Sequence, residues 1–158
     1  MARLPYYTLE PELYKQYLAF NEAVGQKPAL KGIKELVTLR ASQINGCAFC
    51  VDMHVKEAKL KGERELRLHH VAIWHESPLF NDKERAALQW TETLTRLPAE
   101  GVSDAQYQSM LKEFSEEDLT ALTFLIVAIN GWNRLGVAFQ PVPGSSDKLL
   151  GLDKAGLV

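Results

Sequence analysis

The 158-residue sequence lacks features that would indicate several classes of protein. It has only two cysteines, too few for a secreted domain held together by several disulfide bonds. It has no block of basic residues and its net charge is −2, so nothing favours binding to the phosphates of nucleic acids. Residues 1–7 contain no apolar segment of the kind found in a secretory signal. These absences predict a cytoplasmic protein without a nucleic-acid partner.

No apolar run is long enough to predict a membrane span. The longest mostly apolar stretch, residues 119–129, is about half of the roughly 20 residues that a helix needs to cross a bilayer. Hydrophobic residues make up 46% of the chain and charged residues 24%, as in ordinary globular domains with one core. We therefore expect one domain over residues 1–140, followed by an extended C-terminal arm, rich in Pro, Gly and Ser, over residues 141–158.

Capping and turn residues divide the chain into segments of helical length, and no alternating strand pattern is present. Start signals such as Pro11 and Asn81 precede these segments, and stop signals such as Gly25 and Gly46 end them. The predicted fold class is all-α, with about six to seven helices. The expected helices span residues 11–24, 29–44, 47–62, 63–74, 81–97, 103–114 and 116–139.

Both cysteines belong to one short motif, in which Cys47 and Cys50 are followed four residues later by His54. On a helix these spacings place all three side chains on one face, and the cysteines can reach the Cα separation of roughly 4.4–6.8 Å that a disulfide needs. A disulfide that closes so short a loop stabilises a fold little, which favours a reactive pair. Asn45 and Gly46 predict that the pair begins a helix, where the helix dipole lowers the pKa of a thiol. The unperturbed pKa of histidine, about 6.5, suits His54 to carry the proton.

Two other interpretations of this motif stay open on spacing alone. Unpaired cysteines are common in protein cores, and a histidine on an apolar helix face is usually structural. A zinc site would need four ligands, so His69, His70 or His75 would have to join the motif. Redox chemistry is favoured over both, and we expect neither a metal nor a cofactor.

Four further polar residues lie on helices that are expected to be largely apolar. Glu35 lies opposite the apolar stripe of its helix, which predicts a solvent-exposed carboxylate. Asn130, Asn133 and Arg134 share one face of the longest helix, where buried polar groups need partners. We expect these three to form a structural polar network, with contact to the thiol site as the alternative.

The segment from Glu35 to His54 resembles the core of the carboxymuconolactone decarboxylase superfamily, and specifically its AhpD-like branch. The resemblance rests on a CxxC motif, the histidine four residues after it and a glutamate twelve residues before it. Residues 74–80 and 84–88 also look similar to a single-domain subgroup. The resemblance implies an all-helical protein that assembles as trimers or hexamers and acts as an alkylhydroperoxidase.

The resemblance also implies a role for each residue of the motif. Cys50 corresponds to the thiol that attacks a hydroperoxide, and Cys47 corresponds to the resolving thiol that forms a disulfide with it. Glu35 and His54 correspond to the proton relay, so Glu35 would belong to the site instead of the surface. Phe49 stands where some relatives carry a second histidine, which implies a shorter relay or a weaker peroxidase.

The implied partners are a hydroperoxide substrate and an external dithiol reductant, either a lipoyl-bearing or a thioredoxin-like protein. Two alternative functions remain beside this one. The first is decarboxylase or lyase chemistry of the carboxymuconolactone type, which generally needs no CxxC motif. The second is a non-enzymatic, redox-sensing oligomer in which the cysteine pair only records oxidation.

Overall fold

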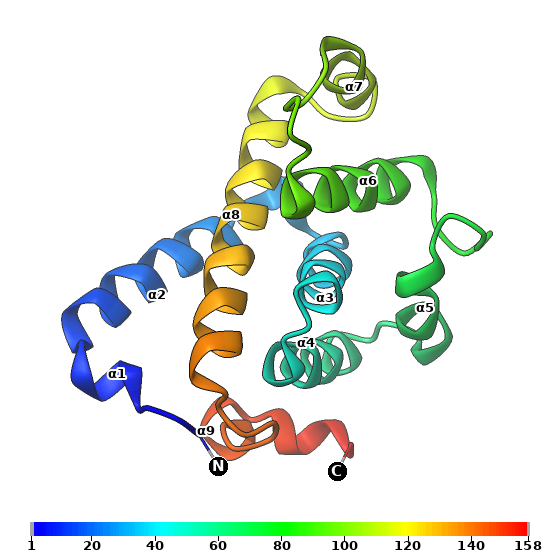
Figure 1. Cartoon of the computed structure of the whole chain (residues 1–158). Coiled ribbons are helices and arrows are strands. Elements are labelled where there is room, and N and C mark those ends of the chain that lie inside the picture. The colour runs from blue at the N-terminus through cyan, green and yellow to red at the C-terminus, as the bar shows by residue number, and fades with distance from the viewer. Residues whose placement is uncertain (1, 158) are drawn as a thin grey trace.

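A computed structural model describes residues 2–157, and this part of the chain is all-α, without a β-strand (Figure 1). The predicted fold class is confirmed, and seven α-helices remain in the described residues when the two four-residue helices α1 and α9 are set aside. Three short 3-10 helices are η1 (Pro28–Leu30), η2 (Val71–Ile73) and η3 (Leu152–Ala155). The α-helices are α1 (Tyr6–Leu9), α2 (Pro11–Gly25), α3 (Lys34–Asn45), α4 (Ala48–Leu60), α5 (Glu65–His70), α6 (Asp82–Arg96), α7 (Asp104–Met110), α8 (Glu116–Phe139) and α9 (Asp147–Leu150).

Reciprocal capping defines the starts of two helices, as the sequence predicted. The Asn81 side chain accepts a hydrogen bond from the backbone N–H of Glu84, whose carboxylate accepts one from the backbone N–H of Asn81. Ser103 and Gln106 form the same arrangement before α7. Ser115 caps α8, because its side-chain oxygen accepts a hydrogen bond from the backbone N–H of Asp118, three residues later. Each cap satisfies N–H groups that have no partner within the helix.

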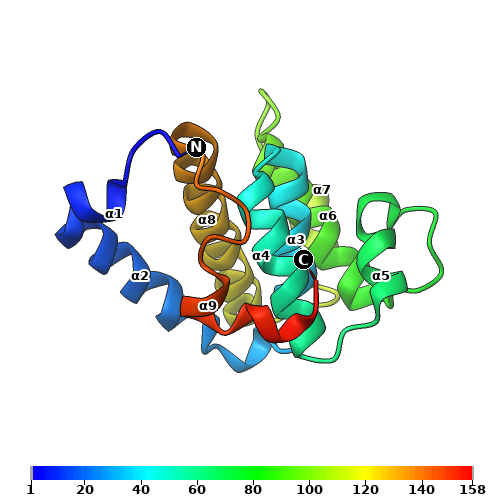
Figure 2. The same cartoon turned by 90° about the horizontal axis from the view of Figure 1, so that it is seen from below.

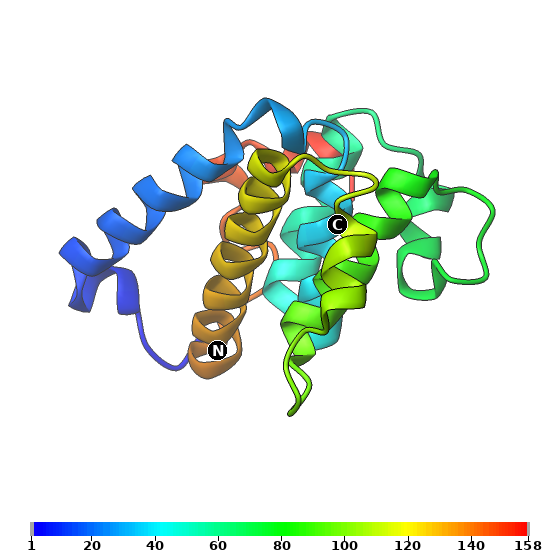
Figure 3. The ribbon, with the colours of Figure 1, turned by 90° about the horizontal axis from the view of Figure 1, so that it is seen from above.

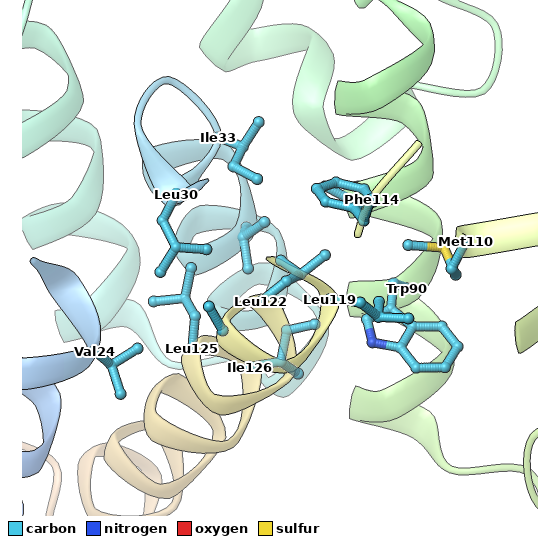
Figure 4. Packing of buried hydrophobic residues seen from close by; sticks show 13 residues of the cluster. Val24, Leu30, Ile33, Trp90, Met110, Phe114, Leu119, Leu122, Leu125 and Ile126 are labelled. Carbon is cyan, nitrogen blue, oxygen red and sulfur yellow. The ribbon is translucent and has the colours of Figure 1, made fainter. Parts of the chain in front are cut away.

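The long helix α8 packs against α2, α3 and α6 (Figures 1 and 3). In the main core, Leu122, Leu125 and Ile126 of α8 share one cluster with Leu30 and with Trp90 of α6 (Figure 4). By length and composition alone, α8 would suffice to cross a membrane. Part of its apolar surface is buried in the core, where α2, α3, α4 and α6 pack against it.

A second apolar cluster joins α3 to α4, α5 and α6. It contains Leu36 and Leu39 of α3, Ala58 of α4, Leu68 of α5 and Leu88 of α6. The helix α3 contributes to both clusters and therefore lies near the middle of the molecule (Figure 1). The two clusters hold α3 in place. Because α4 begins three residues after α3 ends, they also determine the position of the N-terminus of α4.

Some helix boundaries differ from the prediction. The helix expected from residue 29 begins only at Lys34, because residues 28–30 form η1 and Gly32 has a φ of +84°, a left-handed conformation that interrupts an α-helix. The segments 63–74 and 103–114 hold shorter helices than expected, since α5 gives way to η2 and α7 ends at Met110.

The segment 141–157, which we call the C-terminal strap, is not the extended arm that the sequence predicted. It contains α9 and η3 and crosses below α8 and α4 (Figures 1 and 2). Leu152 and Ala155 of η3 are buried, and η3 packs on α4. These apolar residues explain why the strap folds back onto the domain, because an extended arm would leave them in water.

An ion pair holds the strap on α4. The Nζ atom of Lys56 lies 2.6 Å from Oδ2 of Asp147 in the strap and 2.9 Å from Oδ2 of Asp52 in α4. The backbone N–H of Gly144 donates a hydrogen bond to the same Asp52 oxygen. Lys56 itself is only 4% exposed, so this is an interior contact and not a surface one.

Candidate functional site

The cysteine pair lies at the junction between α3 and α4. The chain leaves α3 after Asn45 through Gly46, whose φ of +66° is in the left-handed region that favours glycine. Cys47 is the N-cap of α4, and its Sγ accepts a hydrogen bond from the backbone N–H of Cys50 at 3.3 Å. The predicted position of the pair at a helix N-terminus is therefore confirmed.

Cys47 and Cys50 form a disulfide with a Cα separation of 5.3 Å. Both residues are buried, at 2% and 3% exposure. Gly136 of α8 covers them so closely that a Cβ atom at this position would lie 2.5 Å from Sγ of Cys47 and 3.1 Å from Sγ of Cys50. A side chain at residue 136 would therefore push α8 away from the disulfide. Sequence reasoning missed Gly136, although a glycine inside an apolar helix is a signal of close packing.

His54 follows Cys50 by one turn of α4 and is 7% exposed. Its Nδ1 atom lies 2.8 Å from Oε2 of Glu57, three residues later. Because a carboxylate only accepts hydrogen bonds, Nδ1 carries a proton, and in the neutral ring Nε2 is left with a free lone pair. Among residues 2–157, Nε2 of His54 is the only buried side-chain nitrogen or oxygen for which no protein atom is a hydrogen-bond partner.

Glu57 was not singled out by the sequence, yet it is the residue that contacts His54. Burial alone would raise the pKa of Glu57, but the hydrogen bond with His54 and the positive charges of His54, Lys34 and Lys61 hold this pKa below its ordinary value of 4.5. Glu57 is thus a carboxylate at neutral pH. A histidine and a glutamate three residues apart are the only sequence signal for this pair.

Glu35 of α3 lies in the same region but has another partner. Its Oε1 atom lies 2.5 Å from Nζ of Lys61, just after α4, and its side chain is 14% exposed. It is therefore less exposed than helical periodicity predicted. The charge of Lys61 also acts on Glu57. Among the described residues, the hydrogen-bond partner of the Glu35 carboxylate is Lys61 and that of His54 is Glu57, so no hydrogen bond joins Glu35 directly to His54.

The expected polar network on α8 connects this helix to the end of α3. The Asn45 side chain donates hydrogen bonds to Asn133 at 2.9 Å and to Asn130 at 3.0 Å, and Asn133 donates one to Ser42 at 2.9 Å. Arg134 is exposed and donates to the backbone and side-chain oxygens of Asn130. The network holds the segment that precedes Cys47, which supports the structural interpretation of these residues.

His70 and His75 have partners outside the cysteine motif. Nδ1 of His70 lies 2.9 Å from Oγ of Ser77, and His75 stacks on Trp74 with ring centres 3.7 Å apart. Within residues 2–157, no three His, Cys, Asp or Glu side chains are grouped so that they could hold a metal ion.

The fold and the site together define an all-α protein with a disulfide at the N-terminus of one helix and a histidine on the next turn. The chain belongs to the carboxymuconolactone decarboxylase family, which matches residues 11–93. Its similarity to ATU0492, described below, supports the AhpD-like branch of that family.

Three relatives are informative. The chain is 35% identical to the uncharacterized protein YdfG of Bacillus subtilis (strain 168) over 136 residues. This alignment covers 86% of this chain and 92% of YdfG. The crystal structure of ATU0492, a protein of unknown function from Agrobacterium tumefaciens, matches with a TM-score of 0.86 at 37% identity and covers 90% of this chain and 98% of that protein. A role as the antioxidant defence protein AhpD has been suggested for ATU0492.

The third relative is a peroxidase-related protein with an alkylhydroperoxidase AhpD core from Ralstonia eutropha JMP134. It matches with a TM-score of 0.78 at 19% identity, over 89% of this chain and 75% of that protein. At this level of identity the likeness shows the fold alone.

Proposed function

We propose that the protein is a thiol-dependent peroxidase that reduces hydroperoxides through a Cys50 thiolate and the Cys47–Cys50 disulfide. The observation that carries the proposal is the disulfide at the start of α4 with a buried, unpartnered histidine nitrogen on the next turn. The similarity to ATU0492, for which a role as the antioxidant defence protein AhpD has been suggested, supports the choice of substrate class.

The first half of the proposed cycle oxidises Cys50. In the reduced protein, Nε2 of His54 takes the proton of the Cys50 thiol, and Glu35 belongs to the relay by resemblance to AhpD-like proteins. The thiolate attacks one oxygen of the hydroperoxide, an S–O bond forms and the O–O bond breaks. Cys50 becomes a sulfenic acid, and the leaving alkoxide takes the proton from His54 to give an alcohol.

The second half restores the thiols. The Cys47 sulfur attacks the sulfenic sulfur of Cys50, the disulfide forms, and the hydroxyl group leaves as water with the proton of the Cys47 thiol. An external dithiol, lipoyl-bearing or thioredoxin-like, then exchanges with the disulfide and becomes oxidised itself. The two sulfur atoms are buried, so this exchange requires a local opening of the protein around them.

The test is peroxide consumption in the presence of a dithiol, for the wild type and three variants. Cys50→Ser removes the attacking sulfur and is expected to reduce the rate to background. In a parallel reaction without dithiol, Cys47→Ser is expected to consume one equivalent of peroxide and to leave a sulfenic acid that a dimedone probe traps. Glu35→Gln is expected to lower the rate by roughly 100-fold, the lower end for a group that transfers a proton. Consumption by Cys50→Ser at the wild-type rate would disprove the proposal.

The two alternatives predict different results in the same assay. A decarboxylase or lyase would consume no peroxide and would turn over a lactone-like acid irrespective of Cys50. A redox sensor would be oxidised once by peroxide, with the disulfide forming, but would not turn over when dithiol is added. The wild type therefore separates the three functions before any variant is made.

We also propose that the protein is cytoplasmic and forms a homo-oligomer, a trimer or a hexamer. Large apolar side chains at the surface of α2 and α8 support assembly, with Leu13, Phe124 and Val127 exposed by half or more. Light scattering coupled to gel filtration measures the mass directly. A monomer at micromolar concentration would contradict the proposed assembly.

A further inference from the structure

The hydrogen bonding of His54 is asymmetric in a way that a structural histidine would not need. One ring nitrogen, Nδ1, lies 2.8 Å from Oε2 of Glu57, whereas the other, Nε2, is buried without a partner. A buried polar atom without a hydrogen bond costs free energy, so such atoms are rare and often functional. An ordinary surface pair three residues apart would leave both groups in water and would not bury the second nitrogen.

One helix carries the three groups concerned. Cys50, His54 and Glu57 occupy three successive turns of the same face of α4. Side chains of a helix lean toward its N-terminus. The carboxylate of Glu57 accordingly reaches back to Nδ1 of His54, and His54 follows Cys50 by one turn of α4.

We infer that Glu57 is a positioning residue for Cys50: its carboxylate binds the Nδ1–H group of His54 and so keeps Nε2 free to accept the proton of the Cys50 thiol. The proton moves from Sγ to Nε2, and the carboxylate stabilises the imidazolium that results. This inference rests on the proposed function in one respect, the assignment of Cys50 as the reacting thiol.

The charges around Glu57 suit this role. The groups that act on it are His54, Lys34 and Lys61, and together they keep it ionised. Glu35 takes the direct contact with Lys61, at 2.5 Å. The two glutamates are thus not equivalent, because Glu57 contacts the histidine and Glu35 contacts a lysine. A matched pair of variants, Glu57→Gln and Glu35→Gln, can separate their effects.

The experiment measures the alkylation rate of Cys50 by iodoacetamide as a function of pH. The background is Cys47→Ser, which cannot form the disulfide and leaves Cys50 as the only thiol. Glu57→Gln keeps the shape of the side chain and removes its charge. In this variant we expect the Cys50 thiolate to form about one pH unit higher than in the parent protein. Alkylation near neutral pH should then be about tenfold slower.

Three further variants show whether Glu57 acts through His54. Glu57→Asp is expected to restore part of the loss, because it keeps the charge. His54→Gln is expected to slow alkylation at least as much as Glu57→Gln, and the double variant should be no slower than His54→Gln. Glu65→Gln, which removes the partner of Lys59 at the surface, serves as the control and should leave the profile unchanged. Additive losses in the double variant would show that Glu57 does not act through His54.

Nitrogen NMR of the ring reports the tautomer directly, without any reaction. In the folded wild type, we expect the neutral His54 ring to carry its proton on Nδ1, and Glu57→Ala to lose this preference while keeping the wild-type circular dichroism. A proton on Nε2 in the wild type, or an alkylation profile that Glu57→Gln leaves unchanged, would overturn the inference. Neither measurement uses peroxide. If the shifts occur and the wild type consumes no peroxide, the role of Glu57 stands and the proposed peroxidase function fails.

Discussion

Lys56 and His54 are both buried on α4, at 4% and 7% exposure, and they lie on opposite sides of the helix because residues two apart are about 200° around its axis. Lys56 donates hydrogen bonds to two carboxylates, those of Asp52 and Asp147. Asp52 also accepts a hydrogen bond from the backbone N–H of Gly144. These hydrogen bonds, led by the one to Asp147, raise the pKa of Lys56. His54 has one partner, Glu57, and a second nitrogen without any.

The difference between the two sides separates a structural polar group from a chemical one. A buried ammonium group is tolerated where its hydrogen bonds replace those it loses to water, as they do for Lys56. A nitrogen such as Nε2 of His54 lowers stability by about 1–3 kcal/mol while it has no partner. The strap side of α4 therefore contributes to stability, and the cysteine side retains a group that can accept a proton.

Replacing Lys56 with methionine should have the largest effect on stability, because it removes the ion pairs that hold the C-terminal strap on α4. Two carboxylates would then face each other without the cation between them. Losing one partner of a buried ion pair costs about 3–5 kcal/mol, and we expect roughly 2–3 kcal/mol here because the carboxylates retain some exposure to water. Urea unfolding measures the loss.

Lys59→Met is the matched control for that substitution. Lys59 pairs with Glu65 at the surface, where water screens the two charges and the pair contributes little to stability. Neither substitution should shift the pH midpoint of Cys50 alkylation in the Cys47→Ser background. Equal losses of stability in Lys56→Met and Lys59→Met would refute the distinction between the two sides of α4.

Gly136→Ala should have the second largest effect, and it acts on the cysteine side. The new methyl group would lie 2.5 Å from Sγ of Cys47, so α8 has to move away. Overpacking of this kind costs about 1–3 kcal/mol, and the better helix propensity of alanine offsets up to about 1 kcal/mol, so we expect a net loss of roughly 1–2 kcal/mol. Thermal unfolding of the oxidised protein provides the measurement.

Gly25→Ala at the end of α2 is a suitable comparison. Its methyl group would meet only Nζ and Cε of Lys34, the end of a flexible side chain that can move aside. This variant should unfold within about 0.5 kcal/mol of the wild type. A stability of Gly136→Ala equal to that of Gly25→Ala would mean that α8 does not constrain the disulfide.

The features that depend on local spacing were predictable from the sequence. The all-α fold follows from capping residues such as Asn81 and Ser103, which act within one helical turn. The position of Cys47 at the start of α4 follows from the Asn45–Gly46 stop signal. Asn133 was predicted to need a polar partner because it lies on an apolar helix, and it has two.

The features that depend on packing between distant segments were not predictable. Gly136 is 86 residues from Cys50, so only the approach of α8 to α4 gives this glycine a role. Glu57 is close to His54 in sequence, but the burial that leaves Nε2 without a partner comes from surrounding elements. The strap is a third case, because residues that are common in flexible arms surround two apolar side chains that become buried.

The smallest expected effect concerns the acid stability of the Glu57 pair, and it sharpens the comparison on the cysteine side. The pKa of Glu57 is lower in the folded protein than its ordinary value of 4.5, so the folded state favours the ionised form. The stabilisation is therefore complete above pH 4.5 and is lost as the pH falls through the folded pKa. The wild type should exceed Glu57→Gln in stability at neutral pH by less than about 1 kcal/mol, because the carboxylate is partly exposed and water screens it.

Urea unfolding of both proteins at a series of pH values tests this sign. The groups that act on Glu57 are His54, Lys34 and Lys61, and both proteins contain all three, so the difference between wild type and Glu57→Gln isolates the charge of Glu57. The difference in stability between wild type and Glu57→Gln should shrink toward zero below pH 4.5. A difference that grows in acid would mean that the folded protein prefers the protonated carboxyl group, and Glu57 could not then hold the Nδ1–H group of His54 as a carboxylate.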